Sequence, residues 1–181
     1  RRRDAGLTAP SAAEQVQALA RAKALDVMAS TDPQEAEVVV GCDSMLEISG
    51  QVVGKPADAA QARERWRMMS GGTGILHTGH FLVRTADGAI AEGVSSATIR
   101  FGSPSQAEVE AYIASGEPLW CAGAFTIDGL GGAFIEGIDG DPHGVVGISL
   151  PLLRRLLADL EVVWTDLWAP PPAAKPADDA H

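Results

Sequence analysis

The sequence is short of cysteine and aromatic residues and has no long hydrophobic run. Only two of its 181 residues are cysteines, Cys42 and Cys121. Two cysteines make no disulfide framework, and a reducing cytoplasm is their natural setting. No apolar run approaches the roughly 20 residues of a membrane-spanning helix, and the chain opens without a secretory segment. We therefore expect a cytoplasmic protein with no membrane partner.

Positive charge is also scarce. Lysine and arginine number 14 against 24 acidic residues, which gives a net charge of −10. This balance argues against a nucleic-acid partner, although a few local cations can still hold a small anion. Lysine occurs only at Lys23, Lys55 and Lys175. Lys175 lies in a Pro/Ala stretch, so Lys23 and Lys55 are the candidates for a specific task.

The hydrophobic fraction of 46% predicts an ordinary globular protein. We expect an α/β fold in one domain over residues 1–168, followed by a Pro/Ala-rich disordered tail at 169–181. Ser11 and Glu14 form a capping-box pattern before a predicted helix at about 12–29. Further helices are predicted at about 59–69 and after Pro104 and Ser149, and strands at 38–42, 45–48, 51–53, 75–84, 89–101, 122–127, 133–138 and 161–164.

A polar pair follows the first predicted strand. Three valines and Gly41 read as a short buried strand, and the chain then reaches Asp43 and Ser44. Ligands of open α/β sheets lie beyond the carboxyl ends of the strands, so an acid here is placed for chemistry. A turn or cap aspartate is the alternative, and the stretch alone leaves both open.

Lys23 also has two interpretations. With Val16, Leu19 and Val27 it follows steps of three and four, which places it on an apolar helix stripe. A lysine there either serves a site or extends past its neighbours to water.

The histidines, cysteines and tryptophans are assigned to packing. His77 and His80 are three apart in a predicted strand, which points them to opposite faces and away from a shared metal. Neither cysteine has a recognisable catalytic histidine partner in the sequence. The remaining acids and lysines suggest a site where carboxylates hold Mg²⁺ or Mn²⁺ and lysines hold phosphate.

Several short motifs, taken in order, resemble those of the Maf family of nucleotide pyrophosphatases, which is related to the inosine-triphosphatase superfamily. They span about residues 23–157, and the segment from Ser115 to Gly147 is the most specific part. The matching pieces are Val39-Val40-Gly41-Cys42-Asp43-Ser44, Gly54-Lys55-Pro56, Met69-Ser70-Gly71, His77-Thr78-Gly79, Tyr112-Ile113-Ala114-Ser115-Gly116-Glu117-Pro118, Ala122-Gly123-Ala124-Phe125, Ile127-Asp128-Gly129-Leu130-Gly131 and Val145-Val146-Gly147-Ile148.

The resemblance implies an elongated mixed sheet flanked by helices, with two lobes around a deep cleft. It implies a hydrolase that cleaves nucleoside triphosphates, including non-standard or modified ones, to monophosphate and pyrophosphate with a divalent cation. It also implies a role in septum formation and division arrest. Members of the family are often homodimers, and an acidic monomer is the other possibility here.

Residue by residue, the resemblance makes Asp43 the proton-accepting aspartate and Lys55 a second catalytic residue. It assigns substrate binding to Lys23, Ser44, Glu117 and Asp128, and makes Glu117 a second metal ligand beside Asp43. Ser44 and Asp128 match positions associated with base preference.

The chain also departs from the family pattern. The opening strand and the Ser-x-Ser-Pro-Arg-Arg motif are not present, and Arg1–Arg3 are expected to be the end of that motif, which makes Arg2 a candidate for substrate binding. Ser44 stands where threonine is usual, and Asp128 where one subgroup has glutamine. A carboxylate and an amide make different hydrogen bonds to a base, so the preferred base is left open. The competing hypothesis is a regulator that binds a nucleotide or a partner without turnover.

Overall fold

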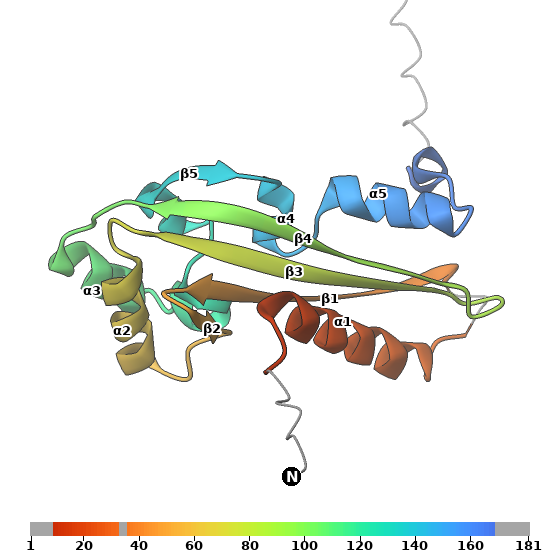
Figure 1. Ribbon diagram of the computed structural model, residues 1–181, viewed down its shortest axis with the longest axis horizontal. Helices are drawn as coiled ribbons and strands as arrows, with labels where there is room; N and C mark the ends of the chain where they lie inside the picture. Colours follow the sequence, from red (N-terminus) through yellow and green to blue (C-terminus); the bar gives the residue numbers. More distant parts are fainter. Residues whose placement is uncertain (1–8, 33–35, 169–181) are drawn as a thin grey trace, which may run out of the picture.

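The computed structural model describes residues 9–32 and 36–168. A five-stranded sheet in the order β2-β1-β3-β4-β5 forms the centre of the molecule (Figure 1). Its strands are β1 (Val38–Ile48), β2 (Gln51–Val53), β3 (Thr73–Arg84), β4 (Ile90–Phe101) and β5 (Ile135–Asp139). The α-helices are α1 (Ala12–Met28), α2 (Ala59–Met69), α3 (Gln106–Ala114), α4 (Pro142–Val146) and α5 (Leu150–Asp159), and the 3₁₀ turns are η1 (Glu117–Trp120), η2 (Ala122–Ala124), η3 (Leu130–Phe134) and η4 (Trp164–Leu167).

The expected α/β class is confirmed, but the sheet is not mixed. Every described strand pair is antiparallel. Short hairpin turns join β1 to β2 and β3 to β4, which is the connection that antiparallel strands allow. Two lobes around a deep cleft stay a prediction. So does the division at residue 168, because residues 169–181 lie outside the described part of the chain, as does Arg2.

The predicted helix caps are confirmed at both ends of the chain. At α1, the Ser11 hydroxyl accepts from the Glu14 N–H, and the Glu14 carboxylate accepts from the Ser11 N–H. At α5, the Ser149 side chain accepts from the N–H of Leu152. These bonds satisfy backbone donors that a helix start leaves without partners.

Helix α1 lies unusually close to β1 and β3, on the face opposite to α5 (Figure 1). Gly41 of β1 and Gly79 of β3 face the helix, and a Cβ at Gly41 would overlap the carbonyl oxygen of Ala20. The fully buried residues of the helix are accordingly small: Ala12, Val16, Ala20 and Ala24. The predicted stripe through Leu19 and Val27 was therefore wrong, since these two side chains are 40% and 52% exposed.

Three predicted strands differ from the structure. The strand at 38–42 continues to Ile48, so Asp43 lies in the middle of β1 rather than after its end. The segment 122–127 is not a strand, because Gly123 and Ala124 have φ of 73° and 66°. The segment 161–164 is not a strand either, because Glu161 has a φ of 61° and η4 begins at Trp164.

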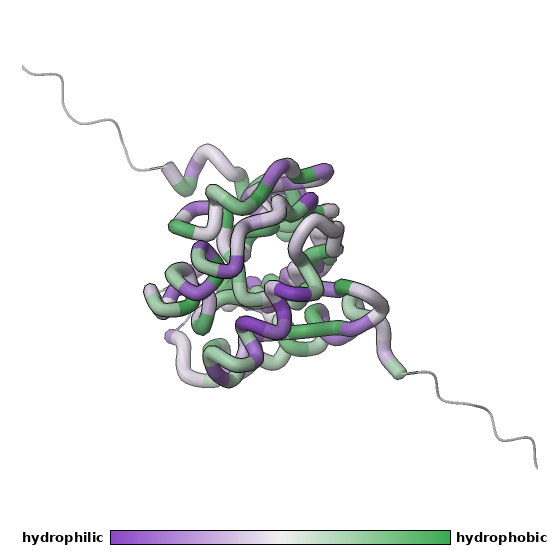
Figure 2. The backbone as a smooth tube through the Cα atoms, turned by 90° about the vertical axis from the view of Figure 1, so that its left-hand side faces the viewer, coloured by the Kyte–Doolittle hydropathy of each residue, from purple (hydrophilic) through white to green (hydrophobic). Residues whose placement is uncertain are grey.

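The largest core cluster fills the space between α2, α3 and one end of the sheet. Trp66 of α2 is its centre, 1% exposed and in edge-on contact with Phe101, Tyr112 and Phe134. Its indole N–H donates to the carbonyl of Ala124 at 3.0 Å, which fixes the η2 segment. Seen along the sheet from the end where α2 and α3 lie, hydrophobic and hydrophilic segments alternate along the backbone (Figure 2).

Candidate active site

A pocket of about 300 Å³ lies at the edge of β1. Strand β2 pairs only with Leu46–Ile48, so among the described residues the earlier part of β1 has no strand neighbour on this side. The carbonyl of Cys42 points to this edge, where it accepts from Nζ of Lys23 at 3.3 Å. The pocket is lined by Lys23, Cys42, Asp43, Ser44, Lys55, Leu76, Trp120, Cys121, Ala122, Phe125, Thr126, Val145, Val146 and Gly147.

The structure brings four of the predicted site residues together here. Lys23 comes from α1, Asp43 and Ser44 from β1, and Lys55 from the loop after β2. Nζ of Lys23 forms an ion pair with the carboxylate of Asp43. Asp43 lies on the same side of β1 as Gly41, because side chains alternate along a strand, and the close approach of α1 at Gly41 brings Lys23 within reach.

The Lys55 loop is held by contacts that sequence patterns did not identify. The Arg65 guanidinium of α2 donates to the carbonyl of Gly54 at 2.5 Å and to that of Lys55 at 3.2 Å. The N–H of Gly123 also donates to the carbonyl of Gly54, at 2.9 Å. Partial burial lowers the pKa of Arg65. Arg65 lies seven residues after Asp58, in a helix that carries several other charged residues. The sequence pattern therefore does not distinguish Arg65 as a residue that supports the site.

Glu117 and Asp128 are not among the residues that line the pocket. The Glu117 carboxylate accepts three hydrogen bonds, from the Tyr112 hydroxyl at 2.9 Å and from the N–H groups of Leu130 and Gly131 at 2.9 and 3.0 Å. Burial acts to raise the pKa of Glu117, but these donors outweigh it and hold the pKa below its usual value. Asp128 accepts a hydrogen bond from the hydroxyl of Thr126, which does line the pocket.

Both cysteines line the pocket as protonated thiols. Burial raises the pKa of Cys42 to about 11, with nearby Lys23 acting in the opposite direction and Asp43 adding to the rise. Burial, Glu117 and Asp128 likewise raise the pKa of Cys121. A thiol with a raised pKa is a poor nucleophile, so neither cysteine is placed for covalent catalysis.

The assignment of every tryptophan to packing was wrong for Trp168, which is 64% exposed, and for Trp120. Trp66 is buried, whereas Trp120 is 76% exposed and lines the pocket. His80 is fully buried and packed, as expected. Its Nδ1 lies 3.0 Å from the carbonyl of Thr78, and its Nε2 accepts from the N–H of Ser149 at 2.8 Å.

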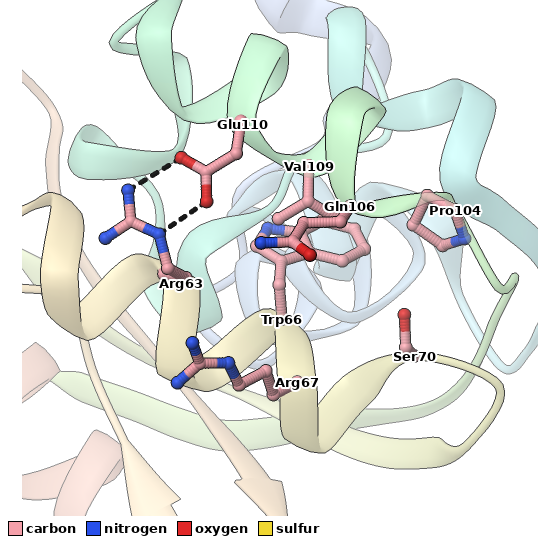
Figure 3. A pocket seen from close by; sticks show the side chains of 8 residues that line it. All are labelled: Arg63, Trp66, Arg67, Ser70, Pro104, Gln106, Val109 and Glu110. Carbon is pink, nitrogen blue, oxygen red and sulfur yellow. Dashed lines mark hydrogen bonds and ion pairs between the residues drawn. The ribbon is translucent and has the colours of Figure 1, made fainter.

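A second cavity of about 300 Å³ lies between α2 and α3 (Figure 3). Its wall includes the indole of Trp66 and the ion pair of Arg63 with Glu110, whose two hydrogen bonds measure 2.5 and 2.7 Å. None of the predicted site residues lines it, whereas Lys23, Asp43 and Lys55 line the pocket at β1.

Two features bear on how the chain can meet a metal or a membrane. Within residues 9–32 and 36–168, no three His, Cys, Asp or Glu side chains cluster as a ready-made metal site. In the same part of the chain, none of the helices is both long and apolar enough to span a membrane.

Comparison with known proteins places the chain in a family. The family model described as "Maf-like protein" matches residues 2–160. A nucleoside triphosphate pyrophosphatase of Streptomyces coelicolor is 53% identical over 164 residues, which cover 91% of this chain and 79% of the relative. A nucleoside triphosphate pyrophosphatase of Salinispora tropica is 54% identical over 153 residues, which cover 83% of this chain and 68% of the relative. A nucleoside triphosphate pyrophosphatase/Nudix hydrolase fusion protein of Bifidobacterium longum is 51% identical over 138 residues, 76% of this chain and 29% of the relative. The predicted relationship is confirmed: this chain belongs to the Maf family.

Proposed function

We propose that this chain hydrolyses nucleoside triphosphates to nucleoside monophosphates and pyrophosphate in the pocket at the edge of β1. The observation that carries the proposal is the meeting of one carboxylate, Asp43, with Lys23 and Lys55 in a chain of the Maf family. Lysine supplies compact positive charge, which suits the phosphates of such a substrate. The names of the relatives support the same reaction.

In the proposed reaction, a water molecule attacks the α-phosphorus. The water oxygen forms a bond to that phosphorus while the bond to the oxygen bridging the α- and β-phosphates breaks, and pyrophosphate leaves with the electron pair. Asp43 either orients the water and accepts its proton or holds the metal ion. Lys55 and Lys23 stabilise the negative charge that grows on the phosphate oxygens.

The donor set fits a hard divalent cation that is bound together with the substrate. Mg²⁺ is commonly held by one or two carboxylates plus substrate phosphates rather than by a complete protein cage. Asp43 is the carboxylate of the pocket and would hold Mg²⁺ or Mn²⁺ there. When bound, the ion would neutralise phosphate charge. Glu117 as a second ligand stays a prediction, and its carboxylate already accepts hydrogen bonds from the N–H groups of Leu130 and Gly131.

The test is release of pyrophosphate from a panel of canonical and modified nucleoside triphosphates, with Mg²⁺, with Mn²⁺ and with a chelator. We expect metal-dependent release that Asp43→Asn nearly abolishes, at a cost of at least about 10²–10³ in rate. Lys55→Gln should show a loss of similar order. Arg155→Gln is the control, because it removes one positive charge from the exposed surface of α5.

No release from any triphosphate by the folded protein would refute the proposal. Nucleotide binding that is indifferent to metal and yields no product would instead support the regulator that binds without turnover. We also propose that the protein works in the cytoplasm, in keeping with its two free thiols. A homodimer and a role in division arrest stay predictions.

A further inference from the structure

A chain of two hydrogen bonds runs from the pocket into the core. Oγ of Ser44 lies 2.7 Å from Oγ1 of Thr78, its cross-strand partner on β3. Oγ1 of Thr78 in turn donates to the carbonyl oxygen of Gly144 in α4, also at 2.7 Å. Thr78 is fully buried, whereas Ser44 is half-buried and lines the pocket.

The direction of both bonds follows from counting protons. A carbonyl oxygen only accepts, so the single hydroxyl proton of Thr78 is committed to Gly144. Thr78 therefore accepts in its other bond, and the hydroxyl proton of Ser44 is committed to Thr78. What remains at Ser44 for a ligand is a lone pair. Helix α4 packs closely against β4 at this point, because a Cβ at Gly144 would come within 2.6 Å of the Ser95 hydroxyl.

Ser44 lies on the side of β1 away from Asp43 and Lys23. Side chains alternate along a strand, so Asp43 faces α1 and Lys23, while Ser44 faces the opposite side. There it shares the pocket wall with apolar Leu76, Phe125 and Val145, which belong to the main core cluster. A wall of apolar side chains with one polar group suits the base of a nucleotide better than its phosphates.

We propose that Ser44 acts only as a hydrogen-bond acceptor toward the base, and that Thr78 is the positioning residue that fixes this role. The pocket would then favour a base that presents an N–H donor to Ser44 over one that presents a ring nitrogen or carbonyl acceptor. This inference rests on the proposed function and adds the polarity of the base contact.

The test compares kcat/KM within two pairs, UTP against CTP and ITP against ATP, because each pair exchanges donors and acceptors along the base edge. We expect the protein to prefer one member of at least one pair by roughly fivefold to tenfold, the size of a neutral hydrogen bond. Thr78→Val frees the Ser44 proton to point into the pocket, so that preference should shrink or reverse. Thr78→Ser keeps the two-bond chain and should keep the preference.

Ser44→Ala removes the acceptor at a partly exposed position and should abolish the preference even where Thr78→Val folds poorly. An unchanged ratio in Ser44→Ala, an unchanged ratio in folded Thr78→Val, or no preference in either pair would overturn the inference. Calorimetry on the same nucleotide pairs gives dissociation constants, which report base preference without any hydrolysis. These constants therefore distinguish failure of the base-contact inference from failure of the proposed hydrolysis. Preference in binding without pyrophosphate release would overturn only the hydrolysis.

Discussion

Lys23 of α1 forms an ion pair with Asp43 of β1, so the candidate catalytic carboxylate already has a cationic partner in the free protein. The Lys23 side chain is 57% exposed and that of Asp43 only 18%, so the acid is the more enclosed partner. A divalent cation bound at Asp43 would compete with this lysine for the same carboxylate.

That competition gives Lys23→Gln two expected effects. kcat/KM should fall by about tenfold or more, because a cation that stabilises phosphate charge is lost. The concentration of Mg²⁺ at half-maximal activity should also fall, because Asp43 loses its competing partner. Steady-state kinetics over a Mg²⁺ titration measures both effects. Lys23→Arg keeps the charge, so it should change both kcat/KM and the Mg²⁺ concentration at half-maximal activity less than Lys23→Gln does. An unchanged kcat/KM in Lys23→Gln would count against a role for Lys23.

Gly41→Ala should destabilise the fold and reduce activity together. The new Cβ would overlap the carbonyl of Ala20 and the side chain of Ala24, so α1 has to move away from β1. Forcing extra volume into a close-packed contact typically costs about 1–3 kcal/mol. Thermal and urea unfolding measure the loss. Gly54→Ala is the matched control, since a Cβ there meets nothing within 4 Å, and equal losses in both variants would contradict the explanation.

Glu117→Gln separates a structural role from a metal-binding role. Gln keeps one acceptor oxygen, but loses the charge that strengthens the bonds from Leu130 and Gly131. A purely structural role predicts a loss of about 1–3 kcal/mol in the free energy of unfolding, with little change in the Mg²⁺ requirement. A large rise in the Mg²⁺ requirement, with stability unchanged, would instead establish Glu117 as a metal ligand.

His80 should make stability depend on pH. Its Nε2 accepts from Ser149, so the ring is neutral with the proton on Nδ1, which donates to Thr78. Burial lowers the pKa of His80, although the Thr78 carbonyl and Asp141 act in the opposite direction. Below the unfolded pKa of about 6.5, the unfolded chain takes up a proton that the folded protein does not.

The free energy of unfolding should therefore fall as pH falls from about 6.5 toward the lowered pKa of the folded state, and the His80 contribution should be complete above about 6.5. Urea unfolding between about pH 5 and 7.5 measures this slope. The slope should be weaker in His80→Gln than in His143→Gln, which leaves His80 in place. Equal slopes in the two variants would show that another group causes the dependence.

The sequence predicted the elements whose signals are local. Ser11 and Ser149 mark the starts of helices that the structure contains, and the predicted strands at 45–48 and 51–53 meet in the β1–β2 hairpin. The family motifs also located Asp43, Lys23 and Lys55, which meet in one pocket.

Features that depend on distant contacts could not be predicted in this way. Ala124 adopts a positive φ and accepts a hydrogen bond from Trp66, 58 residues away, so the β-like composition of its segment was misleading. The buried face of α1 was missed because Gly41 and Gly79 admit alanine where a pattern of large residues was sought. The Thr78 bond to Gly144 joins residues 66 apart and has no sequence signature.

Among the described residues, the part of β1 before Leu46 has no strand neighbour on the side of β2. Exposed strand edges invite other strands to add to the sheet, and proteins protect them with charge, cover or short length. Here Nζ of Lys23 donates a hydrogen bond to the Cys42 carbonyl, and the walls of the pocket border the same edge. The groups that would bind substrate thus also cover part of this strand edge, and an occupied pocket would shield the edge better than an empty one.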